Sequence, residues 1–259
     1  MMETLFLTLL GCLFGSFLNV VIHRLPRAVE AGMPILETLM WPGSTAPCCG
    51  RRLTWTENIP VLSWLAQGGR CRGCGLPINP RYLFVEIVTG IWFGVVGYVF
   101  GLTPIAVLYL LMGLLLIPLF FIDLETFLLP DCLTLTLLGI GFLGSVYHIS
   151  PVALADAILG AVLGFCVPWV FNAAFRLIRH KEGLGGGDVK LLAAIGAWVG
   201  WQSIIPILTI ASVVALVVVA GVLLIGRSKP NMQQMLPFGP FLIVANVLVL
   251  TFGPLPLGF

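Results

Sequence analysis

The sequence predicts an all-α polytopic membrane protein with about eight transmembrane helices and a small cytoplasmic loop-rich module. Three observations predict this class. Of the 259 residues, 59% are hydrophobic, the mean hydropathy is +1.08, and the apolar residues form long runs without charge. Only 9% of the residues are charged, whereas soluble proteins carry about 25%. This composition excludes a disordered chain, a secreted disulfide scaffold and an ordinary soluble enzyme, and the net charge of +2 is too small to indicate a nucleic-acid partner.

A helix that crosses a bilayer needs about 20 mostly apolar residues. Eight segments meet or approach this requirement, at residues 4–22, 82–100, 104–122, 131–148, 152–175, 189–203, 206–225 and 239–256. The strict alternation of barrel strands is absent, so helices are predicted. The first segment is not expected to be a cleavable signal peptide, because no basic residue precedes it.

The basic residues predict the orientation of these helices. All 13 lie between the first and second segments, at the junction of the fifth and sixth, or between the seventh and eighth. They are Arg24, Arg27, Arg51, Arg52, Arg70, Arg72, Arg81, Arg176, Arg179, Lys181, Lys190, Arg227 and Lys229. With eight spans these regions share one side of the membrane, which the positive-inside rule makes cytoplasmic. Both termini are then predicted to lie outside, on the opposite side of the membrane.

The chain divides into three predicted parts: a first transmembrane helix (1–22), a cytoplasmic module (23–81) and a membrane-embedded region of about seven helices (82–259). The module has seven prolines, three tryptophans and four cysteines. It has little apolar material for a core of its own, and small modules of this kind usually need a staple.

The four cysteines of the module are candidates for that staple. The cytoplasm is reducing, so a metal site is favoured over a disulfide. Cys71 and Cys74 form a Cys-x-x-Cys-Gly run like one knuckle of a zinc ribbon. Upstream, Ala46 stands where the other knuckle would have its first ligand, and Cys49 stands where it would have its second. The predicted zinc ligands are Cys49, Cys71 and Cys74, with Cys48 as a further candidate whose adjacency to Cys49 demands awkward chain geometry. The alternative is a reduced module held by its tryptophans.

Four acidic residues are predicted at cytoplasmic helix ends: Asp123, Glu125, Asp131 and Asp188. Ionisable groups at membrane depth are functional-site hypotheses by default. Asp131 follows a proline and opens the fourth segment, which predicts an N-cap, and a solvated position explains Glu125. Asp123 ends the apolar third segment, and Asp188 ends a run of three glycines, which permit positive φ and close backbone approach.

Asp123 and Asp188 therefore predict a pair of membrane carboxylates. Two such groups at low dielectric do not both ionise easily, so one stays protonated while the other is a base. This pair suits hydrolysis of an amide by water, because one carboxylate deprotonates water and the other donates to the carbonyl. A proton-coupled transporter explains paired carboxylates nearly as well, and composition and spacing leave both hypotheses open.

Motifs along nearly the whole chain resemble those of the bacterial type IV prepilin peptidase family, a family of Gly-x-Gly-Asp intramembrane aspartyl proteases. Each motif is weak alone, but their order and placement are specific. They are Phe14-Gly15-Ser16-Phe17-Leu18-Asn19-Val20, Arg24-Leu25-Pro26, Glu57-Asn58-Ile59-Pro60, Leu62-Ser63-Trp64-Leu65, Cys71 with Cys74, Pro80-Arg81-Tyr82 with Glu86, Ile122-Asp123, Leu129-Pro130-Asp131, the run ending at Asp188, and Pro237-Phe238-Gly239-Pro240.

The resemblance implies an aspartic endopeptidase with Asp123 and Asp188 as its catalytic pair. It implies that the substrates are type IV prepilins and pseudopilins, whose basic leader is cleaved on the cytoplasmic side, and that the enzyme lies among membrane lipid. It further implies N-methylation of the new N-terminal residue by S-adenosylmethionine. The sequence has no recognisable methyltransferase fingerprint. Because this donor is polar and charged, its pocket is expected in the soluble module, residues 23–81, with Glu86 below it.

Overall fold

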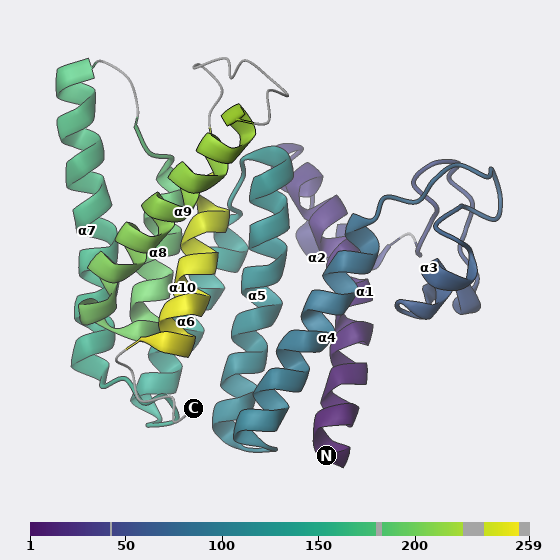
Figure 1. Cartoon of the computed structure of the whole chain (residues 1–259), viewed down its shortest axis with the longest axis horizontal. Coiled ribbons are helices and arrows are strands. Elements are labelled where there is room, and N and C mark those ends of the chain that lie inside the picture. The colour runs from purple at the N-terminus through teal and green to yellow at the C-terminus, as the bar shows by residue number, and fades with distance from the viewer. Residues whose placement is uncertain (42, 180–182, 225–235, 254–259) are drawn as a thin grey trace. The chain divides into compact units, whose positions relative to one another are not determined.

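The computed structural model describes residues 1–41, 43–179, 183–224 and 236–253 (Figure 1). Within these ranges the chain is mostly helical, and the only β pairing is two isolated bridges, Thr45 with Arg52 and Arg70 with Pro77. The all-α prediction is confirmed. Lys181, Arg227, Lys229 and the end of the eighth predicted segment lie outside the described residues.

Each of the eight predicted segments corresponds to one helix. These are α1 (Met2–Glu30), α4 (Arg81–Phe100), α5 (Pro104–Thr126), α6 (Asp131–Val146), α7 (Leu154–Arg179), α8 (Gly186–Val199), α9 (Ile204–Leu224) and α10 (Gly239–Phe252). By length and composition, five helices in the described ranges can cross a membrane: α1, α4, α5, α7 and α9, the last extended by the 3-10 turn η2 (Trp201–Ser203). Helices α6 and α10 are apolar but shorter. The chain is thus a polytopic membrane protein.

Between α1 and α4, residues 31–80 contain short elements only: α2 (Ile35–Met40), η1 (Trp55–Asn58) and α3 (Leu62–Ala66). Helix α1 runs well past residue 22, where the predicted first segment ends, and includes Pro26. The reason is packing, because Ile22, Leu25 and Ala28 remain buried at helical spacing.

The chain forms two compact units, Met1–Pro118 and Leu119–Phe259. In the first unit, α1 and α4 pack together through small residues. A Cβ on Gly94 of α4 would stand 2.5 Å from the Thr8 hydroxyl of α1, so only glycine permits this approach. Close helix contacts of this kind are typical of membrane helices. The unit also holds the cysteine module between these two helices in sequence.

In the second unit, α8 is the buried helix. Every residue from Leu191 to Val199 is buried, and a Cβ on Gly160 of α7 would collide with the Gly196 carbonyl of α8. Two backbones in such contact leave α8 little freedom to shift. The fold therefore offers a well-fixed helix whose first turn carries Asp188.

Candidate active site and cysteine cluster

Asp123 lies in the last turn of α5, where its carboxylate is only 4% exposed. The helix ends because Phe127 adopts a left-handed φ of 56° and Pro130 follows soon after. The N–H of Gly239 donates to Asp123 Oδ2 at 3.0 Å. A Cβ at position 239 would stand 2.6 Å from that oxygen, so glycine is required for this approach.

Gly239 is the first residue of α10, and Pro240 follows it. The first N–H groups of a helix have no partner within the helix and carry its positive dipole end, which favours an anion. Helix α10 thus directs a backbone donor at Asp123. Sequence analysis did not identify this donor, although the Pro-Phe-Gly-Pro motif was a signal for it.

Asp188 lies in the first turn of α8, whose N-cap is Gly185. Its own N–H donates to the Gly185 carbonyl at 3.1 Å, and its side chain is 8% exposed. The carboxylate interacts electrostatically with Asp123 and also with the backbone of Gly239. Both predicted aspartates therefore meet at the N-terminus of α10. Among the described residues, Asp188 Oδ1 is buried without a hydrogen-bond partner.

The predicted N-cap role of Asp131 is wrong. Pro130 is the N-cap of α6, no side-chain cap is formed, and Asp131 is the first helical residue. Its carboxylate instead accepts from Lys190 Nζ, at 2.7 and 2.8 Å to its two oxygens. The cation on a neighbouring helix outcompetes the local backbone donors. Glu125 is exposed on α5, as expected of a solvated side chain.

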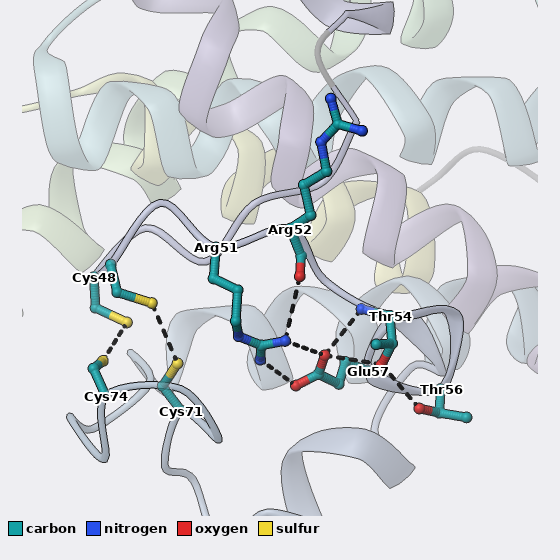
Figure 2. A network of polar contacts seen from close by, with 9 residues as sticks. Cys48, Arg51, Arg52, Thr54, Thr56, Glu57, Cys71 and Cys74 are labelled. Carbon is teal, nitrogen blue, oxygen red and sulfur yellow. Dashed lines mark hydrogen bonds and ion pairs between the residues drawn. The ribbon is translucent and has the colours of Figure 1, made fainter.

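All four module cysteines are brought together, with their Sγ atoms within 4.8 Å of one another. Cys74 Sγ lies 3.0 Å from Cys48 Sγ, and Cys49 Sγ lies 3.9 Å from Cys71 Sγ (Figure 2). Tetrahedral zinc with Zn–S distances of about 2.3 Å needs sulfur atoms about 3.8 Å apart. The Cys49–Cys71 distance matches this spacing, whereas the Cys48–Cys74 distance is shorter. Four thiols gathered around one point, both adjacent cysteines included, are a donor set of the kind that binds one zinc ion.

Two glycine turns explain how adjacent cysteines converge on one point. Gly50 and Gly75 follow the two cysteine pairs with φ of 70° and 72°. Their N–H groups donate to the carbonyls of Ala46 and Cys71, each at 2.8 Å. The backbone N–H groups of Cys74 and Gly73, followed by the Cys48 thiol, lower the pKa of Cys71 to about 6. A thiolate there is the form that a metal binds.

Glu57 supports the cluster from the neighbouring loop. It is 8% exposed and accepts hydrogen bonds from Arg51 at 2.6 and 3.1 Å. It also accepts from the N–H and the hydroxyl of Thr54, each at 2.9 Å (Figure 2). Arg51 first, and then Thr54, lower the pKa of Glu57 to about 2. The pair fixes η1 beside the cysteines.

Glu86 is buried at the start of α4 and is 8% exposed. Its Oε2 accepts from the N–H of Val61 at 2.7 Å, and the Ser16 side chain also hydrogen-bonds to it. Val61 has a φ of 61°, which is rare for a β-branched residue. Glu86 thus joins α4 to the module and holds a strained residue there.

Two family models match the chain. The bacterial peptidase A24 N-terminal domain matches residues 9–100, and the type IV leader peptidase family matches residues 108–220. The prepilin leader peptidase/N-methyltransferase of Aeromonas hydrophila is 41% identical, over 95% of this chain and 89% of that protein. The enzyme of the same name from Pseudomonas aeruginosa is 38% identical with the same coverage. That from Burkholderia pseudomallei strain K96243 is 37% identical over 97% and 86%. No solved structure gives a significant match.

Proposed function

The chain belongs to the prepilin leader peptidase/N-methyltransferase family and is an enzyme of that kind, and we propose that Asp123 and Asp188 are its catalytic pair. The observation that carries this proposal is their convergence on Gly239, with one carboxylate oxygen of Asp188 unpartnered among the described residues. A free oxygen beside a second carboxylate is what a nucleophilic water requires.

In the proposed reaction, the ionised carboxylate of the pair takes a proton from water, and the resulting hydroxide attacks the scissile carbonyl. The protonated carboxylate donates its proton to that carbonyl oxygen, and collapse of the tetrahedral intermediate returns a proton to the leaving amine. The two groups titrate as one unit. Gly239 orients Asp123 through the bond to Oδ2.

The chain is a multi-pass protein of the bacterial inner membrane, and we place its active site at the cytoplasmic face. Lys190 follows Asp188 in α8, while Arg176 and Arg179 end the preceding helix α7. Basic residues mark the cytoplasmic side. Both termini then lie in the periplasm, and the substrates are prepilins and pseudopilins whose basic leaders remain in the cytoplasm.

For methyl transfer, S-adenosylmethionine would supply the methyl group, and we assign its binding to the module, residues 23–81, with Glu86 below it. Of the two buried carboxylates, Glu57 is excluded as a ligand because Arg51 and Thr54 occupy its oxygens. Glu86, which accepts from Val61 and Ser16 and so joins α4 to the module, is the buried carboxylate that we assign to the base of this site.

We assign the structural staple of the module to zinc bound by Cys48, Cys49, Cys71 and Cys74. The spacing of the four sulfur atoms supports this assignment. The metal would cross-link two loops that have little apolar core, and hydrolysis at the aspartates does not involve it.

The test is to incubate the purified full-length protein with a prepilin, with and without S-adenosylmethionine, and weigh the products. Loss of the leader is expected in both samples, and an added methyl group only with the donor. The Asp123→Asn protein should still methylate a substrate that already lacks its leader, because the two activities use separate units. Proton-coupled uptake of a solute without any cleavage would support the transporter hypothesis instead.

A further inference from the structure

One short segment of the chain, Leu129–Asp131, contacts α8 on both sides of Asp188. Before Asp188, Gly187 lies against Leu129, because a Cβ on that glycine would stand 3.0 Å from the Leu129 Cβ. After Asp188, Lys190 donates to both carboxylate oxygens of Asp131. The catalytic residue is therefore bracketed by two contacts from the N-terminus of α6.

The same segment also reaches the residue that orients Asp123. Leu129 Cδ1 lies 3.4 Å from where a Cβ on Gly239 would stand, and Gly239 donates to Asp123. Leu129 is buried, so its side chain is a fixed spacer between the first turns of α8 and α10. The separation of the two carboxylates therefore depends on where Leu129 and Asp131 lie.

We propose that the Asp131–Lys190 ion pair is a positioning device that holds Asp188 at the correct distance from Asp123. This proposal rests on the peptidase function proposed above. Neither side chain takes part in the chemistry. Both act through the backbone of α8, since Lys190 follows Asp188 by two residues in the same helix.

The exposure of the pair agrees with this role. The side chains are 43% and 56% exposed, and exposed ion pairs contribute little to stability. A displacement of about 1 Å in a reacting group, however, can cost about 10²-fold in rate. A weak pair at this place affects the rate far more than it affects unfolding.

The test replaces each partner by its uncharged analogue, Lys190→Gln or Asp131→Asn, in the full-length protein. Cleavage of a prepilin is measured under single-turnover and steady-state conditions. The melting temperature of each variant is measured separately in a thermal melt. The rate constant kcat is expected to fall about tenfold or more while KM stays within about twofold. The melting temperature is expected to shift by no more than about 4 °C. The double variant in which the two residues are exchanged, Asp131→Lys with Lys190→Asp, should have a kcat at least about fivefold higher than that of the less active single variant.

Salt provides a second measurement, made on the wild-type protein and on Lys190→Gln. About 1 M salt shortens the screening length to about 3 Å, so wild-type kcat should fall severalfold as salt rises, whereas that of Lys190→Gln should not. The matched control is Asp156→Ala, which removes the 3.0 Å bond from Trp201 Nε1 between α7 and η2. Its kcat should stay at the wild-type value.

Three results would overturn the proposal: unchanged kcat in both single variants, a raised KM with unchanged kcat, or no recovery in the exchanged pair. The second result would mean that these side chains bind substrate directly. Each is distinguishable from failure of the proposed catalytic pair, because in that case the Asp123→Asn and Asp188→Asn proteins would still cleave the prepilin.

Discussion

Glu57 of the cysteine module and Asp188 of the second unit are equally buried carboxylates, each 8% exposed. Their surroundings differ. Glu57 accepts four hydrogen bonds, two from Arg51 and two from Thr54. Within the part of the chain that the structure describes, Asp188 Oδ1 accepts none.

This difference separates a structural carboxylate from the one that we propose to be catalytic. Burial of a charge is costly unless partners replace the lost water, and most buried polar atoms have such partners. Glu57 satisfies this requirement and so belongs to the fold. Asp188 does not, and its free oxygen remains available for water or substrate. Burial alone would have placed both acids in one class.

The largest expected effect comes from removing the acid function of the unsatisfied group. Asp188→Asn, or Asp123→Asn, should reduce prepilin cleavage by about 10³-fold or more, because an amide neither accepts a proton from water nor shares one with its partner. The melting temperature of Asp188→Asn should hardly change, since no hydrogen bond to Asp188 Oδ1 is lost. Cleavage is followed by mass spectrometry. Full activity in Asp188→Asn would disprove the assignment of the pair.

The next largest effect tests whether zinc links the two cysteine-bearing loops of the module. Cys71→Ser and Cys74→Ser should lose bound zinc and loosen residues 48–75, and Cys48→Ser should lose it to the same extent because its sulfur lies within the cluster. Elemental analysis measures the zinc, and limited proteolysis measures the loosening. Cys12→Ser, in α1, is the control and should keep the metal. Wild-type protein without zinc after careful preparation would contradict the assignment.

The sequence was sufficient for the eight helices. It also singled out Asp123 and Asp188, whose catalytic role stays a prediction, and the four cysteines that the structure brings together. Long apolar runs and the rarity of charge within them carry that information locally. It was not sufficient to predict the contacts of Lys190 and Leu129, because their partners lie in other elements of the fold. The Asp131 cap failed for a related reason, because an acid at a helix start has both local donors and distant cations within reach.

A smaller effect concerns Glu57, the carboxylate whose hydrogen bonds are all satisfied. Glu57→Gln keeps the size of the side chain but removes its charge, and charge-assisted hydrogen bonds are about twice as strong as neutral ones. Hydrogen exchange of residues 54–66 should therefore accelerate about tenfold at pH 7, while cleavage continues. The wild-type protein and Glu57→Gln are both measured in the metal-free form, so that loss of zinc does not contribute to the difference in hydrogen exchange.

The pH dependence of this difference follows from the lowered pKa of Glu57, about 2 in the folded protein against about 4.3 when unfolded. A lowered folded-state pKa stabilises the fold fully above about pH 4.3, and this contribution is lost as pH falls towards 2. The wild-type protein should therefore approach Glu57→Gln in hydrogen exchange over that interval. A difference that stays constant down to pH 2 would mean that ionisation of Glu57 contributes nothing.

The smallest effect extends the comparison to two buried asparagines, Asn19 in α1 and Asn246 in α10, which are 4% and 1% exposed. The amide nitrogen of Asn19 donates to the carbonyls of Gly15 and Tyr82, at 3.3 and 3.0 Å, while its Oδ1 has no partner among the residues described. Neither polar atom of the Asn246 amide has a partner among the residues described. An unpaired buried amide costs about 1–3 kcal/mol, so Asn246→Leu should stabilise the protein by about 1 kcal/mol, or about 2–4 °C in melting temperature.

Asn19→Leu is the matched control and should destabilise the protein, because the Tyr82 carbonyl loses its donor. Thermal melts in one detergent measure both variants. If Asn246→Leu destabilises the protein as much as Asn19→Leu does, its amide is satisfied by a bound water or by a group beyond the described residues, and an unpaired atom is then no guide to function in this chain.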